Sequence, residues 1–200
     1  MKILENDIVK LIPMDASHVD GIWEVCQHED IWTHMSDRLM DYESVVKYVT
    51  KKVKAIEADT DYSYVIIDRE TNKIIGSTTF MDISLQHKRA EIGATWITPS
   101  YWRTAVNSNC KFLLLQYAFE EWGLNRVQIK TGHENIRSQK AIERIGATKE
   151  GILRNHMIRK EGMIRHTVMY SIIKEEWPEI KEHFIKNLLV SYDQNRLGFF

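Results

Sequence analysis

The sequence predicts an α+β fold in which helices flank a mixed, mostly antiparallel sheet of about six or seven strands. Apolar runs typical of strands are interspersed with segments whose apolar residues recur every three or four positions, as in helices. One long helical segment separates two strands, which is the pattern of a βαβ crossover between parallel neighbours. With 200 residues, 44% hydrophobic and 28% charged, the chain is expected to form one domain over residues 1–200.

The individual elements follow from these periods and from the turn signals between them. Strands are predicted at residues 8–12, 62–67, 74–80, 89–97, 126–131, 148–158 and 163–173, and helices at residues 15–26, 41–56, 104–122, 135–145 and 177–189. Asp15 and Asp41 are placed to cap the first two helices, and Gly146 is placed to end the fourth. Pro99 ends the strand before the long helix, and Lys-Glu-Gly at 160–162 predicts a hairpin turn.

The long helix at 104–122 is apolar on two sides, which predicts burial on two sides within a layered structure or at an interface. It connects the predicted strands 89–97 and 126–131. A crossover of this kind places the helix N-terminus beside the carboxyl end of the preceding strand, where ligands bind in open sheets.

The composition excludes several classes of protein. The formal net charge is -1, so there is no basic excess of the kind that nucleic-acid or membrane-surface proteins carry. Cys26 and Cys110 lie far apart without a CxxC pair, and the eight histidines show no ligand spacing, so we expect neither a disulfide nor a metal site. The N-terminus lacks an apolar segment typical of a signal peptide, which predicts a cytoplasmic protein with no membrane partner.

Two segments carry candidate binding residues. The loop before the long helix offers free helix amides, the charge of Arg103 and short donors at Thr104, Asn107 and Ser108, all suited to an anion. The alternative is an ordinary helix start capped by Thr104. In the second segment, Asn-x-x-Ser at 135–138 opens a short helix, and these side chains either face a ligand or only cap the helix.

Taken together and in this order, the segments resemble the GNAT superfamily of N-acetyltransferases. The matching text is EIGATWITPSYWRTAVNSNCKFLLLQYAFEEWGLNRVQIKTGHENIRSQKAIERIGATKEGILR, followed by RKEGMIRHTVMYSIIKEEW. The resemblance is closer to the branch that acetylates the N-termini of ribosomal proteins (RimJ/RimL-like). It extends over a core at about 8–184.

The resemblance implies an acetyl-CoA co-substrate whose pantetheine arm lies in a splay between two central parallel strands, here 91–97 and 126–131. The residues it assigns to cofactor binding are Trp96, Ile97, Thr98, Trp102, Arg103, Thr104, Ala105, Val106, Asn107, Ser108, Asn135 and Ser138. It implies an amine acceptor, no metal, and acceptor specificity set by loops at about 28–44 and 155–165. Acidic residues in the first loop hint at a cationic amine, or belong to a solvated loop.

The chain departs from the family pattern at two places. Relatives commonly carry Gln/Arg-x-x-Gly-x-Gly/Ala in the phosphate loop, where this chain has Trp102, Ala105 and Asn107. Glycine permits a close approach of the backbone and a positive φ, so Ala105 can serve only if its φ stays negative. Many relatives also place a tyrosine acid four residues before Gly146, a position that Ile142 occupies here.

For catalysis, the resemblance to the ribosomal-protein branch assigns Ser138 as the acid or hydrogen-bond donor for the leaving thiolate. Glu91 is the candidate base, acting directly or through a water, or else a surface carboxylate paired with Arg89 or Lys130. A third possibility is that positioning of the two substrates supplies most of the rate.

Three functions remain open at this point. The first is direct acetyl transfer, in a ternary complex, to a primary amine of a protein N-terminus or a small molecule. The second is a non-catalytic acyl-CoA-binding protein of the same fold, which the missing glycines and Ile142 motivate. The third is a homodimeric interaction module, motivated by the twice-buried long helix. The tail at 191–200 is expected to be flexible or to pack on a partner chain.

Overall fold

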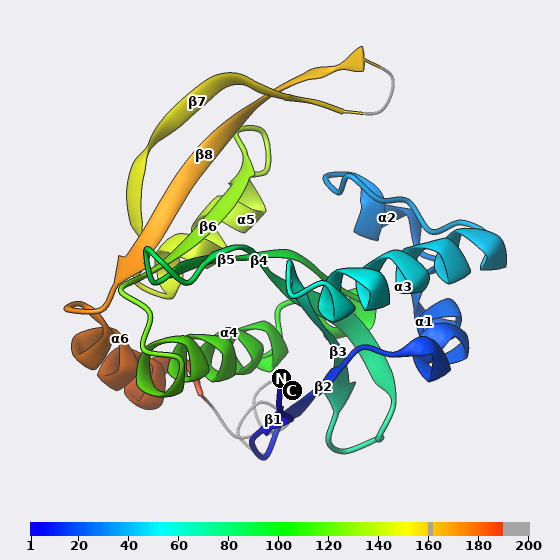
Figure 1. Cartoon of the computed structure of the whole chain (residues 1–200), viewed down its shortest axis with the longest axis horizontal. Helices are drawn as coiled ribbons and strands as arrows, with labels where there is room; N and C mark the ends of the chain where they lie inside the picture. Colours follow the sequence, from blue (N-terminus) through cyan, green and yellow to red (C-terminus); the bar gives the residue numbers. More distant parts are fainter. Residues whose placement is uncertain (160–161, 190–200) are drawn as a thin grey trace, which may run out of the picture.

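A single eight-stranded sheet organises the chain in the computed structural model, which describes residues 1–159 and 162–189 (Figure 1). Its strand order is β1-β2-β3-β4-β5-β6-β8-β7. The strands are β1 Leu4–Glu5, β2 Val9–Pro13, β3 Tyr62–Asp68, β4 Ile74–Ser84, β5 Arg89–Ile97, β6 Arg126–Gly132, β7 Thr148–Ile158 and β8 Ile164–Ile173. Neighbours are antiparallel except β5 and β6, which are parallel and joined through α4. The predicted mixed α+β fold and its crossover are confirmed.

Helices cover both faces of the sheet. They are α1 Val19–Cys26, α2 Glu29–Trp32, α3 Tyr42–Glu57, α4 Val106–Gln116, α5 Ile136–Arg144 and α6 Trp177–His183, with 3-10 turns at Ala16–His18 and Pro99–Tyr101 and π-helical turns at Tyr117–Glu121 and Phe184–Leu188. In Figure 1, α4 and α6 lie beneath the sheet and α1 to α3 lie to its right, while β7 and β8 rise away from the other strands. None of the helices within the described residues combines the length and apolarity needed to span a bilayer.

Local chemistry explains why the predicted elements form where they do. The Asp15 carboxylate accepts the amide of Ser17 over 2.8 Å and the Asp41 carboxylate accepts that of Ser44 over 2.7 Å, so both predicted caps are confirmed. Gly146 has φ +90°, as a residue just past a helix end requires. The predicted turn at 160–162 and the tail at 191–200 lie largely or wholly outside the described residues.

Some boundaries differ from the prediction. The long helix begins at Val106 rather than Thr104, because its N-cap is Ala105 and Thr104 remains in the preceding turn. Two short elements, β1 and α2, have too few residues to show a period, and the sequence did not reveal them. β4 also continues four residues beyond the predicted end at Phe80, up to Ser84.

The sheet separates two apolar cores. On β3, Tyr64 and Ile66 pack in the core beneath α4 and α6, while Val65 and Ile67 pack under α1 and α3, as strand alternation requires. The second apolar side of α4 is also covered within the chain, because Phe112 packs on the rings of α6 and of the turn that follows it. The two-sided burial predicted for this helix is therefore confirmed without a partner chain.

The parallel strands β5 and β6 pair only at their beginnings. Arg89–Glu91 pairs with Arg126–Gln128, and no further pairs follow. Beyond this point β5 contains a bulge opposite β4, where Ala94 adopts φ +45°. A bulge bends its strand and increases the local twist, so β5 leaves β6 and the sheet opens between them. This opening is the predicted splay.

A buried lysine lies next to the bulge. Lys111 on α4 is 7% exposed, and its Nζ donates to Thr95 Oγ1 over 2.7 Å. Thr95 in turn shares a hydrogen bond of 2.8 Å with Thr78 on β4. Burial lowers the pKa of the Lys111 ammonium, since no carboxylate among the described residues lies within ion-pair distance of it.

We expect Lys111→Met to raise the free energy of unfolding at pH 7 by about 1 kcal/mol or more, because methionine fills the site without a buried charge. In the wild type the folded pKa lies below that of the unfolded chain, so the unfolded state binds the proton more tightly. The free energy of unfolding of the wild type therefore increases as the pH rises toward about 10.4, because the buried charge is lost. The variant has no charge at this position and should not show this increase. Urea denaturation at several pH values measures both effects. Exposed Lys54→Met is the control, and destabilisation by Lys111→Met at pH 7 would contradict the account.

Candidate active site

The loop after β5 and the start of α4 form one side of the splay. The helical ladder of α4 begins with Asn109 N donating to Ala105 O over 2.9 Å, so the amides before it precede the ladder and can serve an anion. Ala105 has φ −69°, so it meets the condition under which alanine can replace the family's glycine at this position. The positive φ in this loop falls instead on the exposed Arg103, at +63°. The backbone thus forms the turn without the family's glycines.

Two hydroxyls of this loop already have protein partners. Thr104 Oγ1 donates to Tyr101 O over 2.8 Å and accepts from Val106 N over 3.3 Å. Ser108 is 2% exposed, and its Oγ accepts from Arg144 Nη2 over 3.2 Å. An anion at this helix start would consequently meet backbone amides and guanidinium groups before it met these hydroxyls.

The side chain of Trp102 forms a hydrogen bond to the last residue of β5. Trp102 Nε1 donates to Ile97 O over 2.7 Å, and the Arg137 guanidinium lies 4.0 Å from the centre of the indole. Trp102 therefore links the β5 side of the splay to the first turn of α5 on the β6 side. The Trp96 side chain points into the core under α3, where it packs on Trp32, so only its backbone is available to a ligand.

The other side of the splay is the first turn of α5. Asn135 Oδ1 accepts the amide of Ser138 over 3.0 Å, which confirms the predicted cap. The half-buried Ser138 hydroxyl makes no hydrogen bond within residues 1–159 and 162–189. Ile142, one turn further on, is 5% exposed and belongs to the apolar core. It is a packing residue where many relatives carry an acid.

Glu91 occupies the vertex of the splay. It pairs with Gln128 in the last position at which β5 and β6 are joined, and it is 1% exposed. Its Oε2 forms an ion pair with Lys130 Nζ and accepts a hydrogen bond from Gln128 Nε2, each over 3.0 Å. The alternative prediction, a surface carboxylate paired with Arg89 or Lys130, is wrong about exposure because Glu91 is buried. It is confirmed for the pairing with Lys130. Arg89 instead pairs with Asp82 at 2.5 Å.

Strand alternation separates the two sides of this site. On β6, Val127 and Ile129 pack in the core beneath α4, so Lys130 and Gly132 face the other side of the sheet. There, a β carbon built on Gly132 would lie 2.9 Å from Arg159 Nη2 and 3.4 Å from Arg165 Nε. Two guanidinium groups from the β7–β8 hairpin thus meet the end of β6 at the splay.

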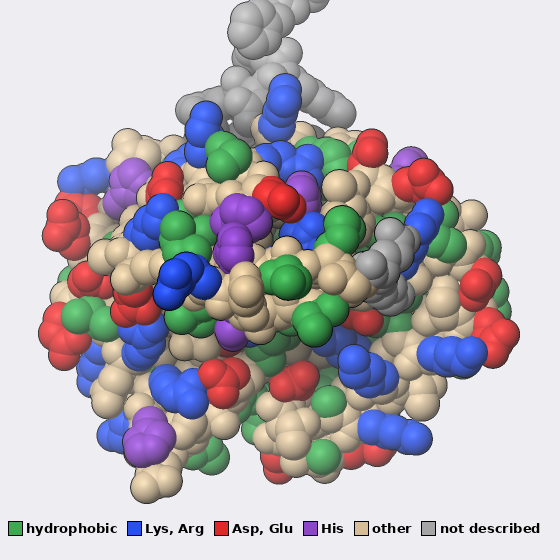
Figure 2. All heavy atoms as spheres, turned by 90° about the horizontal axis from the view of Figure 1, so that it is seen from above, with side chains coloured by type: hydrophobic (Ala, Val, Ile, Leu, Met, Phe, Trp, Pro, Cys, Tyr) green, Lys and Arg blue, Asp and Glu red, His purple; other side chains and the backbone are tan. Residues whose placement is uncertain are grey.

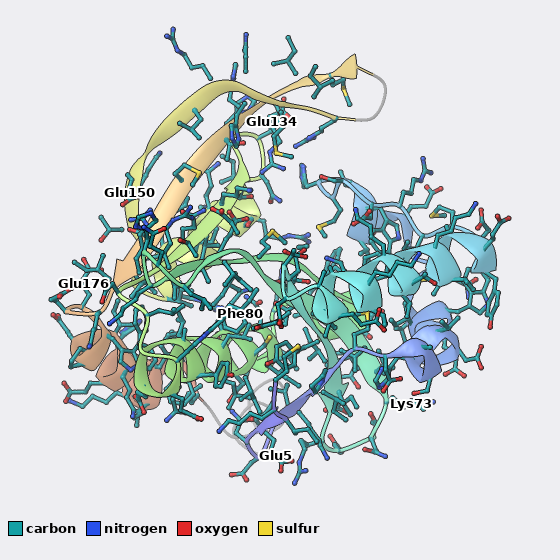
Figure 3. All side chains as sticks on the ribbon, viewed as in Figure 1. Glu5, Lys73, Phe80, Glu134, Glu150 and Glu176 are labelled. Atoms are coloured by element: carbon teal, nitrogen blue, oxygen red, sulfur yellow. The ribbon has the colours of Figure 1, made fainter. Side chains whose placement is uncertain are left out.

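Figure 2 looks down on this hairpin and shows histidine, lysine and arginine side chains gathered near the middle of the face, with carboxylates among them. Glu134, labelled in Figure 3, lies under the hairpin, and its carboxylate is 3.8 Å from Arg159 Nη1. The sequence placed Arg159 and Arg165 within the variable loop at 155–165 and within the matching text, without assigning a role to either of them. No cluster of three or more potential metal ligands occurs in the part of the chain that the structure describes.

Residues 9–148 match the family described as an acetyltransferase (GNAT) domain. The chain belongs to the GNAT acetyltransferase family. The expected fold and the expected class of enzyme are thereby confirmed.

Several GNAT relatives are similar over much of the chain. YoaA of Bacillus subtilis, an uncharacterized N-acetyltransferase, is 25% identical over 173 residues, which are 86% of this chain and 97% of YoaA. A GCN5-related N-acetyltransferase from Brucella melitensis is 30% identical, with a TM-score of 0.84 over 90% of this chain and 82% of its own. YdaF of Bacillus subtilis, provisionally named a ribosomal N-acetyltransferase, is 34% identical over 52% of this chain and 56% of YdaF. The last name agrees with the expected RimJ/RimL-like branch.

Asn135→Ala should lower the free energy of unfolding by about 1 kcal/mol, because the amide of Ser138 loses its capping acceptor. Asn135→Ser keeps a capping oxygen and should remain close to the wild type. Urea denaturation distinguishes the two variants. Equal stability of all three proteins would mean that the cap contributes nothing.

Proposed function

We propose that this GNAT protein is an acetyl-CoA-dependent N-acetyltransferase that moves the acetyl group directly to a primary amine in a ternary complex. The observation that carries the proposal is the splay between β5 and β6, which has the amino ends of α4 and α5 on its two sides. We further propose that residues 1–200 form one cytoplasmic domain able to form a homodimer.

The residues at the splay fit a pantetheine arm and its diphosphate. Beyond Glu91 the β5 backbone pairs only with β4, so the edge that faces β6 offers hydrogen bonds to the amides of the arm, and the first-turn amides of α4 with Arg103 suit the diphosphate. We assign contacts with the arm to the backbone of Trp96, Ile97 and Thr98, and to Asn135. The Ile97 carbonyl already accepts from Trp102, so a bond from the arm would either use its second lone pair or displace the indole.

When bound, acetyl-CoA supplies the acetyl group as a thioester. The amine nitrogen attacks the thioester carbon, a C–N bond forms, the C–S bond breaks, and the sulfur leaves as a thiolate. We assign to Glu91 the removal of the amine proton through a water, since its Oε2 is bound to Lys130 and Gln128 while Oε1 accepts no hydrogen bond from the described residues. We assign to Ser138 a hydrogen bond to the thiolate, because its hydroxyl is otherwise uncommitted.

Acetyl-CoA in millimolar excess should raise the melting temperature, since a ligand that binds only the folded state stabilises it. Release of the CoA thiol, followed across peptides, amino acids, aminoglycosides and polyamines, then measures turnover. The proposal fails when acetyl-CoA causes no stabilisation.

Glu91→Gln should lower kcat by about 10²-fold with little change in the affinity for acetyl-CoA, because general-base catalysis contributes factors of this size. Ser138→Ala should also lower kcat, and Ser138→Thr, which keeps the hydroxyl, should restore most of it. Glu150→Gln is the matched control, since it removes a carboxylate that is ion-paired with Arg126 at the other end of β6. Unchanged rates in both test variants would reject these roles and leave the fold untouched.

The second candidate is a non-catalytic acyl-CoA-binding protein. The absence of the loop glycines and the buried position of Ile142 favour it. Stabilisation by acetyl-CoA without thiol release on any amine of the panel would select it over the enzyme.

A further inference from the structure

Within the proposed function, on which this inference rests, we infer that the acceptor is an amine carrying a carboxylate close to its amino group, and that Arg159 and Arg165 bind that carboxylate. The chemical class includes free amino acids and protein N-termini with an acidic first residue. The argument concerns the face of the sheet opposite α4, which the cofactor contacts assigned above leave free.

The two guanidinium groups lie together and lack hydrogen-bond acceptors for part of their N–H groups. Both contact the space above Gly132, and both Nε atoms are buried without a hydrogen-bond partner within the described residues. Arg165 makes no ion pair there, and the nearest carboxylate to Arg159 is that of Glu134, at 3.8 Å. Buried N–H donors normally have partners, so this pair lacks an acceptor group.

The surrounding charges do not supply that group. Glu91 has its Oε2 bound to Lys130, and the Glu134 carboxylate lies between Arg159 and His133, 3.9 Å from the latter. Burial lowers the pKa of the Arg165 guanidinium most, the neighbouring charge of Arg159 lowers it further, and the charge of Glu91 opposes these two effects only in part. An anion bound between the two guanidinium groups would offset the lowering that remains.

His34 lies close enough to the same two arginines for their charges to act on it. It follows α2, and its Nδ1 is buried without a partner within residues 1–159 and 162–189. Burial lowers the pKa of its imidazole, and the charges of Arg159, Arg137 and Arg165 lower it as well, against the opposing effect of Glu134. A neutral imidazole can donate one hydrogen bond to a carboxylate.

The location of the two guanidinium groups over Gly132 favours an acceptor whose carboxylate is close to its reacting amine. Gly132 is the last residue of β6, and its carbonyl accepts from Asn135 N over 3.0 Å. It therefore adjoins the turn that carries Ser138, the proposed donor to the leaving thiolate, so an anion held over Gly132 lies beside the proposed site of reaction. Guanidinium groups bind carboxylates through paired N–H donors, which gives both affinity and orientation.

The acidic lining suggested by the loop after α1 does not compete with this assignment. Glu29 forms an ion pair with Arg38 at 3.2 Å, and Asp41 caps α3. These two carboxylates are engaged within their own segment, and no carboxylate of residues 28–44 forms an ion pair with Arg159 or Arg165 within the described residues.

The first test compares matched acceptors by CoA thiol release. Each of the twenty amino acids is paired with its own α-amide, and peptides beginning with Asp or Glu are paired with those beginning with Asn or Gln. We expect kcat/KM to be at least about ten-fold higher for the carboxylate member of a pair, as for other charged hydrogen bonds. The first set identifies a free amino acid as the source of the carboxylate and the second set a protein N-terminus. Equal or faster turnover of the amides and of the neutral peptides overturns the inference.

The second test uses Arg165→Gln and Arg159→Gln. Each should raise KM for the carboxylate substrate about ten- to hundred-fold with kcat little changed, and should remove the preference over the amide. Lys149→Gln, which removes a positive charge from the opposite end of β7, is the control and should preserve the preference. Thermal unfolding verifies that each variant is folded, and an unchanged preference in both folded arginine variants overturns the inference.

Binding of acetyl-CoA separates this inference from the proposed function. Loss of discrimination with an unchanged dissociation constant for acetyl-CoA supports the carboxylate site. Should no amine react, titration of the wild type with sodium propionate, followed by the arginine Nε–H signals in NMR spectra, tests the site alone. Saturable shifts of two signals, lost one by one in the arginine variants, support the inference, and their absence overturns it.

Discussion

The short parallel pairing of β5 and β6 is the constraint on which the rest of the site depends. The two strands are joined only as far as Glu91 and Gln128, because the bulge at Ala94 turns β5 away. Every group with a proposed chemical role lies around the gap that results. Thr95, next to the bulge, forms hydrogen bonds with both Thr78 and the buried Lys111 and so stabilises the bulge. The geometry of the gap therefore depends on polar contacts inside an otherwise apolar layer.

The two faces of the gap differ in chemical character. On the α4 side, helix amino ends and backbone groups prevail, which suits a long, flexible, phosphate-bearing molecule. On the other side, charged side chains from β6 and the β7–β8 hairpin prevail, with Glu91 at the vertex. The proposed ternary complex requires two binding surfaces that meet at one point, and strand alternation on β6 gives the gap two chemically different faces.

Much of this was accessible from the sequence. Periodicity gave the principal strands and helices, and the spacing of Asn135 and Ser138 gave a cap that the structure contains. The start of α4 was placed too early, because Thr104 looks like a cap while it bonds within the preceding turn. The contact of Glu91 with Lys130 could be named only as an alternative, and its burial was not predicted, since both depend on where the splay begins. The approach of Arg159 and Arg165 to Gly132 was not predictable, because it depends on the curvature of a hairpin and on a glycine more than twenty residues away.

The indole of Trp102 has an optical consequence. It is bonded to the Ile97 carbonyl and stacked under the Arg137 guanidinium, whereas Trp32, Trp96 and Trp177 are fixed in apolar packing. A molecule that bonds to the Ile97 carbonyl would share or displace that bond and so change the polarity around one fluorophore among six. The emission of Trp102 should therefore report occupancy of this edge of the gap.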